Sequence, residues 1–304
     1  MLDAAIEKIL SATSPGVIDY KGIPIPVSYR KGTSDALIVL FHGVIRRDIR
    51  RFPCYEAFLP VTAHQISIAD PALLANEEIV SSWYLGLEGT DQPALISELV
   101  QGLAQHLGSR KTIYMGGSAG GFAALLYSRL HPGSLAIAVS PQTQLQTYQN
   151  RYVEVFRSSC WPSAAAPDDI ALSDLGRVYR QGFDNTAVLV MSAGDFGHIY
   201  TQFIPFVQNI PLSRREQFVI DIGYWNVRGH PGSVPRTRYT SWIRAALFSP
   251  TLNASDLLDT HYRATDTGPS ATPDAKAATA PAPTGPDPAD IRRADLLRDL
   301  ELKS

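Results

Sequence analysis

The sequence predicts an α/β fold in three layers, with a mostly parallel sheet, helices on both of its faces and one inserted cap. Short apolar runs of strand length alternate along the chain with segments of helical periodicity, an order typical of βαβ units. The apolar runs are rich in Val, Ile and Leu, which suits strands buried on both faces. With 304 residues, 45% of them hydrophobic and 18% charged, the chain can bury one large core.

The expected strands are short runs that end near Gly, Pro or a polar residue. An early strand begins with "IPIPVSYR", residues 23–30, and "ALIVLFHG", residues 36–43, is the first continuous apolar run. The later strands are expected at residues 65–70, 111–117, 134–140, 185–194 and 216–223.

Helical periodicity appears between these runs. Residues 91–108 begin with Asp and Pro and end at Gly, which are start and stop signals of a helix. Further helices are expected in "GFAALLYSRLHPG", which starts at residue 121, and at residues 236–249. Near the N-terminus, one helical face is formed by Leu2, Ile6, Ile9 and Leu10.

Two parts of the chain depart from this alternation. Residues 144–184 separate two expected strands and contain aromatic and helical stretches, which predicts a cap inserted into a domain that spans residues 1–250. Residues 251–290 are rich in Ala, Pro, Thr and Asp, a composition typical of a disordered linker. Residues 291–304 predict a charged amphipathic helix, which is either a surface helix or a docking helix for a partner or another subunit.

Bulk properties exclude several classes of function. A net charge of −2 argues against a general binder of nucleic acid or anionic membranes. Cys54 and Cys160 have no metal-ligand spacing, so we expect buried thiols in a reducing compartment. The N-terminus lacks the pattern of a signal peptide, and no apolar run is long enough to cross a bilayer. We therefore expect a cytoplasmic protein that needs no metal and no organic cofactor.

The stretch "GGSAGG", residues 116–121, points to chemistry. A phosphate-binding P-loop would need Lys and then Ser or Thr after the last glycine, and Phe122 and Ala123 stand there instead. A dinucleotide-binding turn is a poor match because Ser118 occupies its middle glycine position. The pattern G-x-S-x-G fits a nucleophile elbow, in which small neighbours let a strand turn sharply into a helix and present the serine hydroxyl above the sheet.

These motifs resemble the α/β-hydrolase superfamily from about residue 22 to residue 249. The resemblance rests on "LFHGV", "GGSAGG", the strand-end Asp195 and "GHPG". It implies an α/β-hydrolase-like sheet and an oxyanion hole made by the backbone N–H groups of Val44 and Ala119. "WYLG", "GGSAGGFAAL" and "SPQT" are also similar to hydrolase-like proteins of bacterial polysaccharide and glycoprotein export, including glycan O-acetyltransferases.

In this fold the base and the acid of a catalytic triad follow the serine in the order acid, then histidine. His230 lies in a Gly- and Pro-bounded loop after the last expected strand, which is where the base is expected. His198 is a second candidate, either as base or as a residue that binds substrate. Asp195 ends a strand and fits the acid, and Asp221 is the alternative. His42 precedes the serine, which favours a structural role.

Substrate contacts are expected on two segments. Arg46 and Arg47 belong to "VIRRDIRRF", where arginines four residues apart share a helical face. They could bind a phosphate or carboxylate, or form a solvated helix face that pairs with Asp48. Trp225, in the loop before His230, either forms a wall of the substrate pocket or packs beneath that loop.

The sequence thus favours a serine esterase or deacylase that acts on a small-molecule or glycan ester through an acyl-enzyme. Ser118 would be the nucleophile, His230 the base and Asp195 the acid. Two alternatives stay open. One is an O-acyltransferase, such as an acetyltransferase, that acts on a glycan or polysaccharide, and the other is a non-catalytic hydrolase-fold protein that binds a partner.

Overall fold

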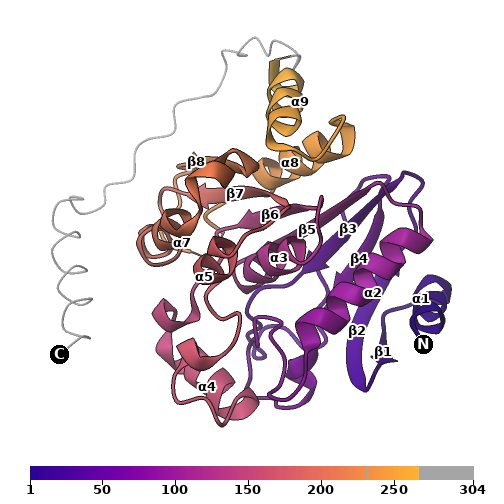
Figure 1. Ribbon diagram of the computed structural model, residues 1–304, viewed down its shortest axis with the longest axis vertical. Helices are drawn as coiled ribbons and strands as arrows, with labels where there is room; N and C mark the ends of the chain where they lie inside the picture. The colour runs from indigo at the N-terminus through magenta and orange to yellow at the C-terminus, as the bar shows by residue number, and fades with distance from the viewer. Residues whose placement is uncertain (231, 267–304) are drawn as a thin grey trace, which may run out of the picture. The chain divides into compact units, whose positions relative to one another are not determined.

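A computed structural model describes residues 1–230 and 232–266 of the chain. An eight-stranded sheet with the order β1-β2-β4-β3-β5-β6-β7-β8 forms the centre (Figure 1). The strands from β4 through β8 are all parallel, whereas β2 runs antiparallel to both of its neighbours, so the expected mostly parallel sheet is confirmed. The strands are β1 (Gly16–Tyr20), β2 (Ile23–Arg30), β3 (Ala36–Phe41), β4 (His64–Ile68), β5 (Lys111–Gly117), β6 (Leu135–Val139), β7 (Thr186–Ser192) and β8 (Phe218–Gly223).

Helices cover both faces of the sheet, which gives the three expected layers (Figure 1). On one face lie α1 (Leu2–Ser11), α2 (Gln92–His106) and α3 (Ala119–Arg129), and on the other α8 (Arg236–Phe248) and α9 (Ala254–Asp266). The remaining helices are α4 (Asn150–Cys160), α5 (Leu175–Arg180), α6 (Phe196–His198) and α7 (Ile204–Asn209). There are also 3-10 turns at Pro71–Leu74, Leu145–Thr147, Pro167–Asp169 and Leu212–Gln217, and a π-helical turn at Ile199–Phe203.

The segment 144–184 contains α4 and α5 between β6 and β7. Phe156 of α4 packs edge-to-face on Trp83 with ring centroids 5.5 Å apart, and the Trp161 indole donates a hydrogen bond to the carbonyl of Gly86. This segment therefore packs on the loop 81–88. Whether it acts as a cap over the site remains a prediction.

The C-terminal boundary of the domain differs from the sequence expectation. Residues 254–266, which we assigned to the disordered linker, form α9, and the compact unit ends at Asp266. Helix α9 begins where the Asn253 side chain accepts a hydrogen bond from the backbone N–H of Asp256. It is held by the fully buried Leu257 and by His261, which stacks on Trp242 at 3.7 Å. The rest of the expected linker and the helix 291–304 lie outside the described residues.

Three further features of the fold can be compared with the sequence. Strand β1 was not expected, because only Ile18 and Tyr20 of its five residues are buried. Cys54 and Cys160 are free and buried, as expected. Among the helices in the described part of the chain, none combines the length and the apolar character that a bilayer crossing requires.

Candidate active site

Ser118 lies at the sharp turn between β5 and α3. Its backbone adopts φ 57° and ψ −120°, a conformation that a residue with a side chain rarely occupies. The turn can be this tight only with glycines around it. A Cβ on Gly116 would lie 2.2 Å from the carbonyl oxygen of Gly120, and one on Gly120 would lie 2.4 Å from the carbonyl oxygen of Phe41. This is the backbone geometry that the nucleophile-elbow hypothesis requires.

The Ser118 hydroxyl is hydrogen-bonded to Gln142, which was not among the residues expected at the site. The Gln142 side-chain amide donates a 2.8 Å hydrogen bond to Ser118 Oγ, and its carbonyl oxygen accepts one of 2.5 Å from the Trp83 indole. Within the described residues, no hydrogen bond joins Ser118 to His230. The position of Gln142 just after β6, beside the elbow strand, was the available signal.

Asp195 and His230, which are 35 residues apart in the sequence, do meet. His230 Nδ1 lies 2.7 Å from one carboxylate oxygen of Asp195. The other oxygen lies 3.2 Å from Nδ1 of His198, whose ring stacks on that of His230 with centroids 3.7 Å apart. The carboxylate is buried, while about a quarter of the His230 side chain is exposed. The structure thus assembles two histidines on one acid.

The ionisation of Asp195 reflects this environment. Burial alone would raise its pKa, but the hydrogen bonds from His198 and His230 outweigh burial and hold the pKa well below its ordinary value. Asp195 therefore stays a carboxylate at neutral pH. A carboxylate that accepts from the Nδ1–H of an imidazole leaves Nε2 as the nitrogen of that ring that can accept a proton.

The same three side chains offer ligand atoms within 4.8 Å of one another, so they could also hold a metal ion. Imidazole binds a metal along its in-plane lone pair, so two histidines on one ion must aim at a common point. The rings of His198 and His230 lie in nearly parallel planes, 10° apart in angle with centroids 3.7 Å apart, so lone pairs within those planes do not meet at one point. The geometry suits two hydrogen bonds to one carboxylate better than one shared metal.

The loop that carries His230 is fastened to the residue before Asp195. The backbone N–H of Gly229 donates to the carbonyl of Gly194 at 3.0 Å, and the chain at Val227 passes directly over Gly194. A Cβ on Gly194 would lie 2.1 Å from the Val227 carbonyl oxygen. One backbone contact thus ties the loop of His230 to the chain beside Asp195.

Gly194→Ala is expected to destabilise the protein by about 1–3 kcal/mol, because the added methyl must displace the His230 loop. Gly197→Ala is the matched control: a Cβ at Gly197 meets no atom within 4 Å, and the residue lies in α6, where Ala is favoured by about 0.5–1 kcal/mol. Urea unfolding of both variants tests the contrast. Equal effects would contradict a tight contact at Gly194.

His42 orders the loop expected to form the oxyanion hole. Burial lowers the pKa of His42, which keeps the ring neutral. Its Nε2 accepts the backbone N–H of Asp70 at 2.9 Å, so its Nδ1–H donates to the carbonyl of Gly43 at 2.6 Å. That carbonyl belongs to the same peptide unit as the N–H of Val44, so its hydrogen bond fixes the direction in which this N–H points.

The Gly43 backbone also lies close to the nucleophile candidate: a Cβ on Gly43 would be 3.6 Å from Ser118 Cβ. In the described part of the chain, the N–H groups of Val44 and Ala119 have no protein acceptor. Two unpaired donors near one hydroxyl could bind an oxyanion.

The buried residue Asp70 connects the loop after β3, through His42, with the loop 81–88, through Ser82. The Asp70 carboxylate accepts hydrogen bonds of 2.6 Å from both the N–H and the hydroxyl of Ser82. It thereby supports Trp83 and Tyr84, which both have positive φ, at 50° and 61°. Trp83 donates a hydrogen bond to Gln142, and Gln142 donates one to Ser118. Asp70 therefore helps to position the Ser118 hydroxyl indirectly. Asp70 is the last residue of the expected strand 65–70, but its partners lie on a loop whose path the sequence does not reveal.

The segment with the four arginines is not a helix, and that expectation is wrong. A single turn forms there, in which the N–H groups of Ile49 and Arg50 donate to the Arg46 carbonyl, and the N–H of Ile45 donates to the Val80 carbonyl in the loop after β4. Arg46 pairs with Asp48 at 2.7 Å on the surface. Arg47 donates to the carbonyls of Leu73 and Asn76. These contacts lend no support to substrate binding by Arg46 or Arg47.

The other expected residues also have defined contacts. The Trp225 ring packs against Gly223, where an added Cβ would lie 2.6 Å from the ring, so the ring supports the loop. Asp221, the alternative acid, is buried and bonded to Arg238 and Trp242 on the far side of the sheet. His198 contacts Asp195 and His230, and its contacts do not indicate a binding site for substrate.

No protein-family model matches the sequence, and no curated protein matches it significantly. Several solved structures are similar to it in fold. The capsule O-acetyltransferase of Neisseria meningitidis serogroup A matches with a TM-score of 0.53 and 16% identity, over 76% of this chain and 96% of that one. An acylaminoacyl peptidase in complex with a chloromethyl ketone matches with a TM-score of 0.54 and 11% identity, over 79% of this chain and 42% of that one.

Carboxyl esterase 2 from the fungus Tuber melanosporum matches with a TM-score of 0.47 and 17% identity, over 83% of this chain and 86% of that one. Identities this low establish similarity of fold alone. Taken with the strand order, the elbow after β5 and the helices on both faces, the comparisons lead to one conclusion: the chain has an α/β-hydrolase-like fold.

Proposed function

We propose that the protein is a serine acyl hydrolase that works through an acyl-enzyme on Ser118. The observation that carries this proposal is the hydrogen bond between Asp195 and His230, which join from two different loops at the carboxyl end of the sheet. A carboxylate paired with an imidazole in the fold that also contains a strained serine turn is the constellation of a catalytic triad. The unpaired N–H groups of Val44 and Ala119 support the same reading.

In the proposed mechanism, Ser118 Oγ attacks the carbonyl carbon of an ester while His230 Nε2 takes the hydroxyl proton. Asp195 keeps the proton of His230 on Nδ1 and stabilises the imidazolium that forms. The N–H groups of Val44 and Ala119 bind the oxyanion, and each such donor is worth on the order of 3 kcal/mol of barrier. His230 then protonates the leaving alcohol, and water releases the acyl group.

A cavity of about 220 Å³ adjoins the end of the strand that leads into this turn, and its lining includes Gly116 and Gly117 but none of Ser118, Asp195 and His230. Glu56, Arg236 and Tyr239 also line it. Burial raises the pKa of Glu56. A cavity of about 150 Å³ can hold a benzene ring, so a compact group would fit this one.

Acyl transfer to an alcohol is the second candidate, because the chain resembles a capsule O-acetyltransferase in fold. Transfer and hydrolysis share every step up to the acyl-enzyme and differ in what releases it. Acetyl release from p-nitrophenyl acetate, measured with and without a sugar acceptor, separates them. A non-catalytic binding role is less favoured, since it would not require Asp195 and His230 to meet.

The test of the proposal is reaction with a fluorophosphonate, followed by mass spectrometry of the digested protein. We expect one adduct per chain, on the peptide that contains Ser118, and slower reaction for His230→Ala. The same protein unfolded in urea is the control, because reactivity that depends on the site must disappear there. An unmodified Ser118 after exhaustive treatment of folded protein would falsify the proposal.

Gln142→Ala is expected to lower kcat/KM about ten- to a hundred-fold while the adduct on Ser118 still forms. The substitution removes the amide that orients the Ser118 hydroxyl, but it removes neither nucleophile nor base. It also leaves the Trp83 indole N–H without its acceptor, so some stability is lost. Steady-state hydrolysis of p-nitrophenyl acetate measures the effect, and unchanged kinetics would rule out an orienting role for Gln142.

A further inference from the structure

The second histidine on Asp195 has no role in the mechanism above. His198 approaches one oxygen of the carboxylate with Nδ1, at 3.2 Å, and also donates its backbone N–H to that oxygen at 3.4 Å. His230 takes the other oxygen. A triad needs only one of these contacts. The acid is thus held from both sides by rings that come from different segments.

The environment of His198 indicates that its position is enforced. Its ring lies between His230, stacked at 3.7 Å, and Tyr148, which meets it at a steep angle with centroids 6.1 Å apart. The side chain is buried, and its Nε2 has no hydrogen-bond partner in the described part of the chain. An unpaired buried nitrogen is costly, and an apolar side chain would avoid that cost. The hydrogen bond from its Nδ1–H to Asp195 best explains why a histidine, and not an apolar residue, occupies this position.

We propose that His198 is a positioning residue of this site, which anchors the second oxygen of Asp195 and supplies the flat surface against which the His230 ring is oriented. The inference rests on the proposed function and deepens it. It assigns to His198 no contact with the substrate.

This role has a consequence for the protonation of His230. The titratable groups packed around His230 are Asp195 and His198, with Tyr148 behind His198, and Arg228 in its own loop is exposed. The bond from His198 withdraws part of the negative charge that Asp195 offers to His230, and the stacked ring keeps water from one face. Both effects disfavour the imidazolium. Loss of His198 should therefore make His230 more basic.

Two variants separate the contribution of the flat His198 ring from that of its Nδ1–H group. His198→Phe keeps a flat ring but has no Nδ1–H, whereas His198→Asn loses the ring but carries an amide N–H near the position of Nδ1. For His198→Phe, we expect the acidic limb of the kcat/KM profile to move to higher pH by about 0.5 to 1 unit. His198→Asn is expected to stay closer to wild type than His198→Phe, which is rescue by the conservative variant.

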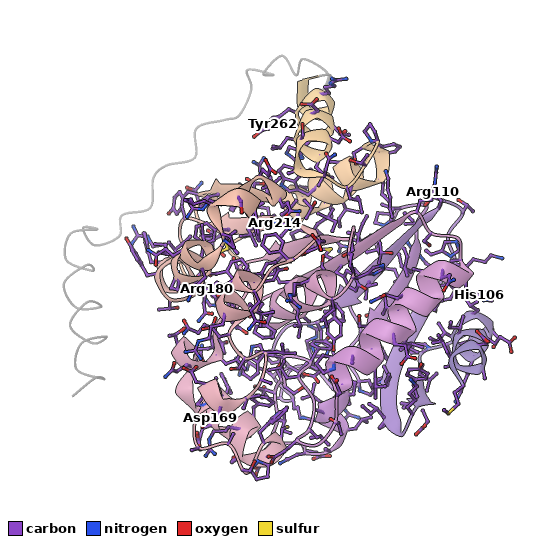
Figure 2. All side chains as sticks on the ribbon, viewed as in Figure 1. His106, Arg110, Asp169, Arg180, Arg214 and Tyr262 are labelled. Atoms are coloured by element: carbon purple, nitrogen blue, oxygen red, sulfur yellow. The ribbon has the colours of Figure 1, made fainter. Side chains whose placement is uncertain are left out.

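NMR titration of the histidine rings measures the same shift without turnover. His106, at the exposed end of α2, provides the control variant His106→Phe, which should leave the His230 titration unchanged (Figure 2). A purely structural role for His198 would lower activity without moving the limb, and that result would overturn the inference, as would equal shifts in both variants. If His198→Phe does not fold, His198→Leu takes its place.

The two proposals fail separately. A wild-type protein whose Ser118 forms no adduct would refute the acyl hydrolase, and the NMR titration would still decide the role of His198. Conversely, an active enzyme whose His230 titrates identically in wild type and His198→Phe would refute the positioning role alone.

Discussion

Ser118→Ala is expected to lower kcat for p-nitrophenyl acetate by about ten-thousand-fold or more, because the atom that forms the proposed acyl-enzyme is removed. Ser140→Ala is the matched control. Ser140 also follows a strand with a positive φ, of 40°, and its buried hydroxyl has no partner among the described residues. We expect the control to stay within a few-fold of wild type. A Ser118→Ala protein with substantial activity would assign the chemistry to another residue.

The stability of Ser118→Gly tests the backbone strain at this turn. Alanine keeps the Cβ that is strained at φ 57°, whereas glycine adopts this conformation freely. Residues held in such conformations carry about 1–3 kcal/mol of strain. Both variants should be inactive, but Ser118→Gly should unfold at a higher urea concentration than Ser118→Ala. If the glycine variant is the less stable of the two, the turn is not strained as its dihedral angles imply.

The strands and the elbow could be predicted because their signals are local. A continuous apolar run such as residues 36–41 is buried on both faces wherever it lies in a parallel sheet. The glycines around Ser118 likewise reflect contacts within a few residues of the turn and with the adjacent strand. The pairing of Asp195 with His230 followed from their position after the last strands, once the fold class was known.

The remaining features depend on contacts between distant segments. Gln142 reaches Ser118 because β6 lies beside β5, and the loop that carries Trp83 folds over both strand ends. Regular spacing of arginines in "VIRRDIRRF" suggested a helical face, but only one turn forms there, and the N–H of Ile45 is bonded to Val80 in the loop after β4. Periodicity alone does not reveal such competition. The start of α9 was readable, since Asn253 precedes Asp256 in a capping pattern that the overall composition obscured.

Asp195→Asn is expected to lower kcat/KM by about a thousand- to ten-thousand-fold. The carboxylate accepts from two rings, and an amide has only one oxygen to offer. Its NH₂ group must face either His198 or His230, and that ring then has to accept at Nδ1 and carry its proton on Nε2. If the ring is His230, the base is lost. Hydrolysis of p-nitrophenyl acetate measures the loss, and adduct formation on Ser118 should slow in parallel.

The stability difference between wild type and Asp195→Asn is expected to depend on pH. Burial raises the pKa of Asp195, but the two histidine hydrogen bonds outweigh it, so the folded-state pKa lies below the unfolded value of about 4. A group of this kind stabilises the native state above the unfolded pKa, and the contribution is lost as the pH falls through the folded pKa. The difference in unfolding free energy between wild type and Asp195→Asn should therefore narrow below about pH 4.

Asp221→Asn shows whether these effects are specific to one acid. Asp221 is also buried, and it pairs with Arg238 at 2.8 Å and accepts from the Trp242 indole at 2.7 Å, on the face covered by α8. Removing its charge leaves a partly buried Arg238 without its partner, so the protein should be less stable, while kcat/KM of the folded fraction should change less than about three-fold. Were Asp221→Asn to abolish turnover and Asp195→Asn to spare it, the acid would be Asp221, and the pairing of Asp195 with two histidines would have to serve structure instead.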